Sequence, residues 1–217
     1  MIDGIDIAIY NSPNWDELTE EGFKFAIIKV SEGINLEDPK WREHYDNAIA
    51  HDWFVGPYHY FRPQYTGVQQ FDWHESITSK VNWHFPSMND VEEESYNPGQ
   101  SVYFERVRQF NDEAWAYWER RPLLYTSKYK WEKLCGGKAI DADLVVAHWT
   151  VAAQPFVPRG FSDWLFWQHW VDRERWLDLE RFNGDMNALR KYAGVDEPIV
   201  YKTNVPKDVD KIVINLI

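Results

Sequence analysis

Strand-type and helix-type segments alternate along most of this chain. The strand-type runs are apolar and rich in β-branched or aromatic residues, and they cover residues 2–9, 23–30, 53–61, 88–92, 122–126, 144–149 and 164–170. Segments with helical spacing cover residues 14–18, 39–51, 67–81, 100–120 and 185–192. This order predicts a parallel sheet with helices outside it. We therefore expect an α/β fold whose sheet is closed, or nearly closed, into a barrel.

The length of 217 residues favours one large domain over several small modules. We expect a catalytic barrel over residues 1–193. The pattern changes afterwards, because residues 198–201 and 211–217 are β-type runs separated by a polar loop. We expect residues 194–217 to form either an added hairpin or the start of a linker.

Charge and cysteine content exclude several classes of protein. Asp and Glu total 35 against 23 Lys and Arg, a net charge of -12, which argues against nucleic acid or an anionic membrane surface as partner. No apolar run is long enough for membrane insertion. Cys135 stands alone, so no internal disulfide can form. A nucleophilic Cys135 is the alternative to a buried residue at a helix end, and we favour the buried residue.

Four acidic residues fall where strands of the predicted barrel end, which is where active sites of such barrels lie: Asp6, Asp90, Glu92 and Asp178. One residue separates Asp90 from Glu92, so the period of a strand directs both carboxyls to the same face. Like charges this close repel each other, so one of the two carboxyls keeps its proton to higher pH than the other. Glycosidic cleavage needs that split, with one protonated acid and one carboxylate.

The Asp-x-Glu pattern alone does not decide the function. Glu93 and Glu94 follow it directly, so a solvated acidic loop explains the same residues equally well. The choice rests on other segments of the chain.

Several further motifs occur in a fixed order from about Asp3 to Leu189. They are Gly4-Ile-Asp-Ile-Ala8, Phe25-Ala-Ile-Ile-Lys-Val-Ser-Glu-Gly33, Gly56-Pro-Tyr-His-Tyr-Phe-Arg62, Pro86-Ser-Met-Asn-Asp-Val-Glu92, Leu124-Tyr-Thr-Ser127, Val146-Ala-His-Trp-Thr150, Phe166-Trp-Gln168 and Asp178-Leu-Glu-Arg-Phe-Asn-Gly184. Together they resemble glycoside hydrolase family 25, the Chalaropsis-type lysozymes of phage endolysins, bacterial autolysins and some fungi.

The resemblance implies an irregular, TIM-like β/α barrel and hydrolysis of the β-1,4 bond between N-acetylmuramic acid and N-acetylglucosamine in bacterial peptidoglycan. It implies that Glu92 is the general acid. Asp90 matches the carboxylate that orients or stabilises the substrate's N-acetyl group, with direct nucleophilic attack as the other role considered. Asp6 and Asp178 match further acids of the cleft. No metal or organic cofactor is expected.

Five more residues match positions that line the family's sugar site: Tyr58, Tyr60, Tyr125, Trp149 and Gln168. Aromatic residues make up 17% of the chain, and packing in the core is the competing explanation for each aromatic position. We interpret Lys29 and Glu32 as an internal ion pair. We interpret His59 and His148 as hydrogen-bonded strand residues rather than metal ligands.

The chain departs from the family pattern at three places. Asn89 replaces an apolar residue before the Asp-x-Glu, and Tyr10-Asn11-Ser12 replaces a Trp-Gln-Gly type sequence, so substrate preference is expected to differ. Residues 71–84 have no clear counterpart in the family, and we expect them to shape the cleft wall.

Two other functions remain open at this level. A non-hydrolytic glycan-binding protein on the same barrel would use the aromatic residues and only hydrogen-bond through the acids. A chitinase-type barrel would need a longer acidic strand motif. The first ten residues lack an export signal. We therefore expect either a phage endolysin, made in the host cytoplasm and released to the wall, or a secreted protein whose signal was removed. No oligomeric state is predicted.

Overall fold

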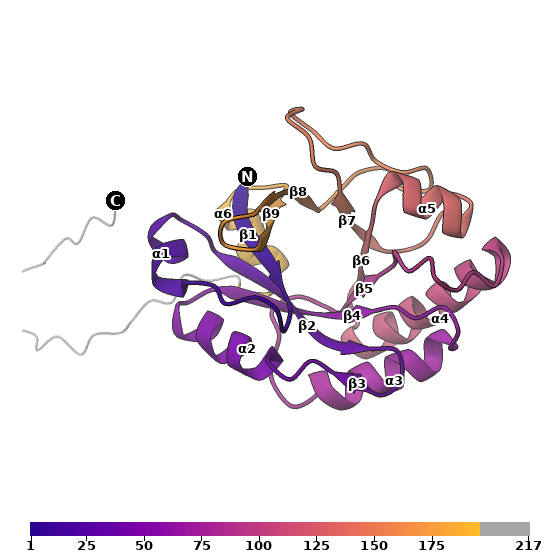
Figure 1. Cartoon of the computed structure of the whole chain (residues 1–217). Helices are drawn as coiled ribbons and strands as arrows, with labels where there is room; N and C mark the ends of the chain where they lie inside the picture. The colour runs from indigo at the N-terminus through magenta and orange to yellow at the C-terminus, as the bar shows by residue number, and fades with distance from the viewer. Residues whose placement is uncertain (196–217) are drawn as a thin grey trace, which may run out of the picture.

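The computed structural model describes residues 1–195, and its nine-stranded sheet closes on itself (Figure 1). The order around the sheet is β1, β9, β8, β7, β6, β5, β4, β2 and β3, and pairing of β1 with β2 completes the barrel. The strands are β1 (Ile2–Ile7), β2 (Phe25–Glu32), β3 (Leu36–Glu37), β4 (Phe54–Tyr60), β5 (Met88–Asp90), β6 (Leu123–Thr126), β7 (Asp143–Ala147), β8 (Phe166–Asp172) and β9 (Leu177–Phe182). The barrel predicted from the sequence is confirmed.

The expected parallel sheet is observed for β1, β2 and β4 to β8, but β9 is not among the strand-type runs expected from the sequence and departs from this direction. This strand runs antiparallel to both of its neighbours, β1 and β8. Only residues 173–176 connect β8 to β9, and a connection this short permits a hairpin but no parallel crossover. As a result, the beginning of β9 lies at the same end of the barrel as the carboxyl ends of the parallel strands.

Helices cover the outside of the barrel, and Figure 1 shows α2, α3 and α4 following one another along one side. The helices are α1 (Trp15–Glu20), α2 (Trp41–Ala50), α3 (Gly67–Thr78), α4 (Gln100–Trp118), α5 (Lys128–Cys135) and α6 (Met186–Tyr192). Side-chain caps fix several starts, with Asn14, Thr66, Ser127 and Asp185 accepting from a backbone N–H in the first turn. A long loop replaces a helix between β7 and β8.

Alternating residues of the strands build two apolar layers, one inside the barrel and one beneath the helices. On β2, Ile27 packs inside with Phe85 and Phe166, while Ile28 packs outside. Each such buried side chain contributes roughly 1.5–3 kcal/mol. Gly4 is required by this packing, because a Cβ there would lie 2.5 Å from the Phe25 ring. Aromatic rings therefore close the barrel interior below the polar residues at its carboxyl end.

Residues 71–84 do not form the predicted cleft wall. The side chains of Phe71 and His74 on α3 are buried against the outer surface of the barrel, and Trp83 packs in the outer apolar layer. His74 belongs to a buried polar network, in which Ser31 Oγ lies 2.7 Å from its Nδ1 and Ser87 Oγ lies 2.9 Å from its Nε2. The aromatic residues of this stretch stabilise the helix layer.

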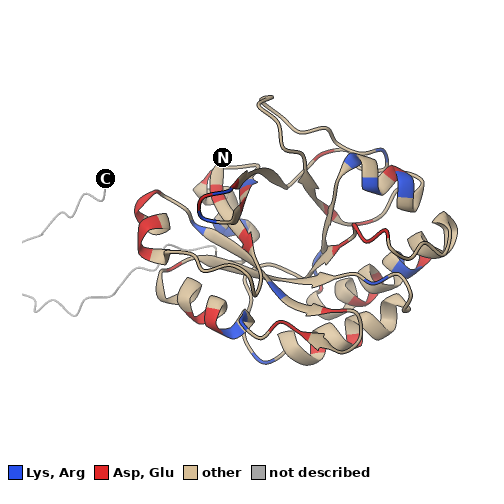
Figure 2. Cartoon of the chain, viewed as in Figure 1, with Lys and Arg blue, Asp and Glu red and all other residues tan. Residues whose placement is uncertain are grey.

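The acidic side chains are unevenly distributed. Figure 2 shows Asp and Glu gathered on α1 and along the segment that follows β5. Within residues 1–195, the structure contains no helix long and apolar enough to cross a membrane. The predicted tail over residues 194–217 lies almost wholly outside the described residues.

Candidate active site

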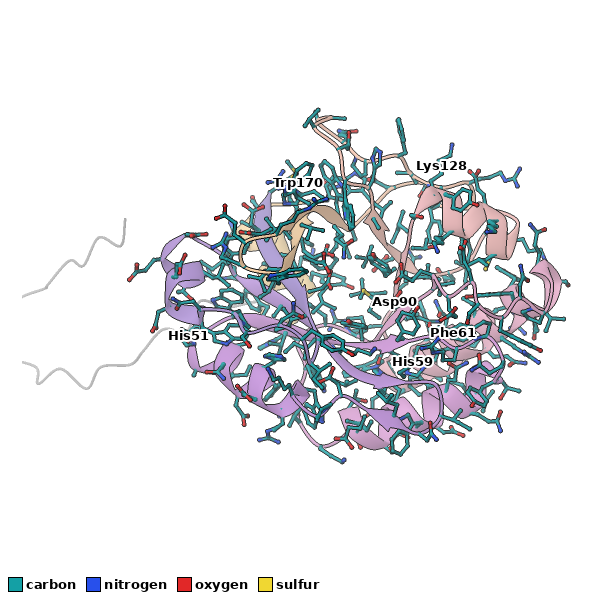
Figure 3. All side chains as sticks on the ribbon, viewed as in Figure 1. His51, His59, Phe61, Asp90, Lys128 and Trp170 are labelled. Carbon is teal, nitrogen blue, oxygen red and sulfur yellow. The ribbon has the colours of Figure 1, made fainter. Side chains whose placement is uncertain are left out.

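The structure brings the four predicted acids together at the carboxyl end of the parallel strands. Asp6 lies near the end of β1, Asp90 ends β5, and Glu92 follows two residues later. Asp178 lies opposite Asp6 on the neighbouring strand, near the beginning of β9 rather than at the end of a parallel strand. In Figure 3, Asp90 lies toward the centre of the barrel.

Asp6 is the end of a hydrogen-bond chain that joins three of the predicted sugar-site residues. Gln168 Nε2 donates to Asp6 Oδ2 at 2.6 Å. Gln168 Oε1 accepts from Tyr125 Oη at 3.0 Å and from Trp149 Nε1 at 3.1 Å. Because both donors bind one oxygen, the amide can present only its nitrogen to Asp6. The chain fixes the Asp6 carboxyl and the Trp149 ring relative to each other.

Burial and the negative charge of Asp178 together raise the pKa of Asp6 to about 7, against the hydrogen bond from Gln168. The pKa of Asp178 is raised by burial as well. Asp6 therefore titrates near neutral pH, where a small change in its surroundings alters its charge.

Asp90 lies deepest of the catalytic candidates, with 6% of its surface exposed. Its neighbours across the sheet are Tyr60 on β4 and Tyr125 on β6. Burial raises its pKa well above the usual range, and the nearby carboxyls of Glu92 and Asp6 add to this shift. Among the described residues, Asp90 Oδ1 has no hydrogen-bond partner. A buried acceptor of this kind is free to take a donor from a bound molecule.

Glu92 lies past the end of β5, in a segment that begins with a firmly held residue. Val91 packs among the outer apolar side chains, its N–H donates to the Tyr125 carbonyl at 2.9 Å, and its carbonyl accepts from Thr126 at 2.9 Å. Lys130 Nζ on α5 donates to the Glu92 carbonyl at 3.1 Å. These contacts fix the backbone of Glu92 although it is outside the strand.

The pKa of Glu92 is raised by burial and by the charge of Asp178, while Lys130 lowers it. Asp90 and Glu92 thus both hold protons to higher pH than free carboxyls do, but the larger shift falls on Asp90, whereas the resemblance implies that Glu92 keeps the proton and Asp90 carries the charge. The shift is larger for Asp90 because it is more deeply buried.

The residues after Glu92 are not a solvated acidic loop. Glu93 is 8% exposed and accepts from Tyr60 Oη at 3.3 Å and from the Ser95 N–H at 2.5 Å, and it forms an ion pair with Arg62. Tyr103 Oη donates to the Glu93 carbonyl at 3.0 Å. The structure therefore contradicts the competing explanation at this segment.

Ion pairs on both sides hold this segment in place. Glu94 lies 3.2 Å from Lys130 Nζ and 3.1 Å from Lys133 Nζ. The predicted pair of Lys29 and Glu32 is present at 2.7 Å, and Arg62 extends it by binding Glu32 at 2.5 Å. Several charges acting together constrain the chain far better than one exposed pair does.

Tyr58 and Tyr60 differ in role. Tyr58 is buried in the barrel interior, and its ring lines a pocket together with Asp6 and Asp178. Tyr60 is half-buried, and the cations of Lys29 and Arg62 lie 4.9 Å and 4.8 Å from its ring centre. Tyr60 therefore supports the segment after Glu92, while Tyr58 borders the acids directly.

Glu180 is a site residue that the sequence reasoning missed. It is fully buried and pairs with Gly4 and Gln168 on the adjacent strands. Within residues 1–195, its carboxyl oxygens have no partner other than the neighbouring Asp6 carboxyl. Burial and the charge of Asp6 raise its pKa well above the usual range. Asp178-Leu-Glu180 repeats the Asp-x-Glu spacing of the first pair, which is the signal that could have identified it.

Other predicted residues lie away from the acids. His59 is buried on the outer face and bonded to Ser31 and Gln70, as expected (Figure 3). His148 lies just after β7, not within it, and accepts from the Phe156 N–H. Asn89 donates to Asn111 on α4 at 2.9 Å, so its departure from the family pattern does not reach the cleft.

Cys135 is fully buried in the outer apolar layer at the end of α5, and burial raises the pKa of its thiol. A thiol in this environment is a poor nucleophile. The interpretation of Cys135 as a packing residue is confirmed.

Comparison with known proteins gives consistent matches over most of the chain. Lysozyme M1 of Streptomyces globisporus is 32% identical over 209 residues, which cover 87% of this chain and 70% of that protein. N,O-diacetylmuramidase of Chalaropsis sp is 28% identical and is matched over 99% of its length, with 88% of this chain. A family GH25 lysozyme from Aspergillus fumigatus superposes with a TM-score of 0.82 at 25% identity, over 88% of this chain and 98% of that one.

A bacterial lysozyme from Streptomyces coelicolor superposes with a TM-score of 0.81 at 28% identity, over 90% of this chain and 98% of that one. The family model described as glycosyl hydrolases family 25 matches residues 5–175, which contain Asp6, Asp90 and Glu92. Sequence and fold therefore agree that the chain belongs to glycosyl hydrolases family 25 and is a glycoside hydrolase.

Proposed function

We propose that this protein is a muramidase that hydrolyses the β-1,4 bond between N-acetylmuramic acid and N-acetylglucosamine in peptidoglycan. The observation that carries this proposal is the cluster of carboxyls around Asp90 and Glu92, in a family whose related proteins include a lysozyme and an N,O-diacetylmuramidase. Glycosidic cleavage requires one protonated acid and one carboxylate at the same site, and two neighbouring carboxyls whose protons are shared can supply both.

Glu92 is the general acid in this proposal. Its backbone is fixed by Lys130 and by the residues around it, while its side chain is only partly buried and can reach a bound substrate. A raised pKa keeps a proton available near neutral pH for the leaving oxygen. Loss of that proton at higher pH ends activity.

Asp90 stabilises the N-acetyl group of the substrate. Its free Oδ1 accepts the amide N–H, and a hydrogen bond to the charged form lowers the pKa of Asp90. The resulting negative charge raises the pKa of Glu92. Substrate binding thus distributes the protons: the empty site favours a protonated Asp90, and the occupied site favours a charged Asp90 beside a protonated Glu92.

The ionised Asp90 also fixes the direction in which the acetamido oxygen points. Holding the amide nitrogen there turns that oxygen toward the anomeric carbon, where it attacks as the glycosidic bond breaks and Glu92 donates its proton. Water then attacks the anomeric carbon and breaks its new bond to the acetamido oxygen. The proton released by this water passes to Glu92. Asp6 and Asp178 position the sugar and maintain the negative field that the developing positive charge requires.

The experiment that tests this function is release of reducing sugars from purified cell walls by Glu92→Gln. The variant is expected to lose about 10²- to 10⁴-fold in rate while its circular dichroism and melting temperature stay unchanged. Glu113→Gln, on the exposed surface of α4, is the matched control and should retain full activity. Equal activity of Glu92→Gln and the native protein would refute the assignment.

A glycan-binding protein without hydrolytic activity is the alternative that the same assay separates. Such a protein would sediment with insoluble peptidoglycan yet neither clear its turbidity nor release reducing sugars. We propose that the enzyme meets its substrate outside the cytoplasmic membrane, where peptidoglycan lies.

A further inference from the structure

Trp176, at the tip of the β8–β9 hairpin, has an exposed side chain on a strained backbone. Its side chain is 75% exposed, and its φ of 54° lies in the left-handed region. Among the described non-glycine residues, Asp52 and Glu119 share this conformation, and both follow the end of a helix, where it is common. Trp176 follows no helix. A bulky residue in this conformation persists only where its surroundings impose it.

Arg175 provides the first of these constraints. Its guanidinium Nε lies 2.6 Å from Asp172 Oδ2, and its NH1 lies 2.8 Å from Glu21 Oε2 beside α1. Asp172 Oδ1 also accepts from the backbone N–H groups of Glu174 and Arg175, both at 3.0 Å. The turn is therefore tied to itself and to the neighbouring helix.

Asn11 provides the second constraint, from the segment after β1. Its Nδ2 donates to the Trp176 carbonyl at 2.5 Å. Its Oδ1 accepts from the Ala8 N–H at 2.6 Å, so the amide cannot turn away. Two independent elements thus hold the backbone of Trp176 while its ring makes little contact with the protein.

Trp176 lines a pocket of about 290 Å³ that also includes acids of the candidate active site. The same pocket is lined by Asp6, Tyr58 and Asp178, and on the outer side by Tyr10, which is 91% exposed. It therefore combines acidic residues with aromatic residues, of which Tyr10 and Trp176 are exposed and Tyr58 is buried. This combination suits a sugar ring, whose C–H face packs on an aromatic ring while its polar groups reach hydrogen-bond acceptors.

We propose that Trp176 is a stacking platform that binds one pyranose ring of the glycan strand next to the site of cleavage. The inference rests on the proposed function, and it assigns to the β8–β9 hairpin a direct part in substrate binding. The strained backbone places Trp176 beside the pocket that Asp6 and Asp178 also line. A residue with a purely structural role at this position would be Gly or Asn, which adopt the left-handed conformation readily.

Trp176→Asn tests the proposal, because it removes the ring and relieves the backbone strain. On soluble, uncross-linked peptidoglycan we expect KM to rise about five- to tenfold with a smaller change in kcat, while the melting temperature stays equal or rises. Trp176→Phe keeps a ring and should stay within about twofold of the native KM. Trp115→Ala, at an exposed Trp on α4, is the matched control and should leave KM unchanged.

A second measurement needs no variant of Trp176. Hydroxyl-radical footprinting of Glu92→Gln with peptide-free glycan strands should protect Trp176 from oxidation and leave Trp115 unprotected. Unchanged KM in Trp176→Asn, or equal oxidation of Trp176 with and without glycan, would overturn the platform. Failure of the native protein to cleave peptidoglycan would instead overturn the proposed function, so the two failures are distinguishable.

Discussion

Asp6 on β1 and Asp178 on β9 lie directly opposite each other in an antiparallel pair. Two acids in this arrangement repel each other, and strand pairs normally avoid it. Burial, together with this repulsion, raises the pKa of Asp6 to about 7. The Asp6–Asp178 pair thus lowers the stability of the barrel at the position where the proposed chemistry takes place.

Asp6→Asn should remove a pH-dependent part of this cost. Folding raises the pKa of Asp6, so its contribution to stability is fully present below the unfolded value of 3.8 and is lost as pH rises through about 7. The free energy of unfolding of Asp6→Asn, relative to the native protein, should rise by up to about 4 kcal/mol between about pH 4 and pH 8. Urea unfolding at both pH values measures this difference. A difference independent of pH would show that Asp6 does not titrate in this range.

Asp178→Asn and Lys130→Gln should move the pH dependence of activity in opposite directions. Asp178 raises the pKa of Glu92 and Lys130 lowers it, and activity is lost as Glu92 loses its proton. The alkaline limb of kcat/KM should therefore shift down by about half to one pH unit in Asp178→Asn and up by a similar amount in Lys130→Gln. A shift of both variants in the same direction would contradict Glu92 as the group that titrates.

Glu180 should act through Asp6 as a protonated hydrogen-bond donor. Glu180→Gln keeps a donor of similar size, so we expect activity within about threefold of the native value. Glu180→Leu removes the donor but fills the space, so stability should be retained while kcat/KM falls about tenfold. Thermal melting and kinetics of the two variants distinguish these effects. Equal activity of the Leu and Gln variants would show that Glu180 only fills space.

His59 should make the protein less stable at acid pH. Burial lowers its pKa to about 4, so the folded state keeps it neutral while the unfolded chain takes up a proton below about pH 6.5. The free energy of unfolding therefore falls by about 3 kcal/mol, through His59 alone, as pH falls from about 6.5 to about 4. His59→Gln should lower stability at pH 7 and flatten this slope, as measured by urea unfolding. An unchanged slope would assign the acid sensitivity to other groups.

Much of the fold could be predicted from the sequence because the relevant signals are local. Strand-type apolar runs located the parallel strands, and the capping residues Asn14 and Asp185 lie where predicted helices begin, whereas α5 was not predicted. The direction of β9 depends on the hairpin at residues 173–176, which has no Gly or Pro to mark a turn. Its turn is held by Arg175 and Asn11, which act across elements that are distant in the sequence.

Prediction of the candidate site from the sequence is limited to local patterns in the same way. Asp6, Asp90 and Glu92 could be predicted because the carboxyl ends of parallel strands meet at one end of a barrel. The chain from Tyr125 through Gln168 to Asp6 joins residues up to 162 positions apart, so no local pattern contains it. Trp176 carries no signal in the sequence beyond being aromatic. Its importance emerges only from its backbone angle and from the pocket that it lines.

The central claim is that this barrel cleaves the glycan of peptidoglycan after N-acetylmuramic acid, with Glu92 as acid. Mass spectrometry of borohydride-reduced digestion products tests it most directly, because reduction marks the sugar at each newly formed end. We expect reduced N-acetylmuramic acid from the native protein and none above background from Glu92→Gln. Reduced N-acetylglucosamine, or uncut glycan with released peptides, would contradict the claim.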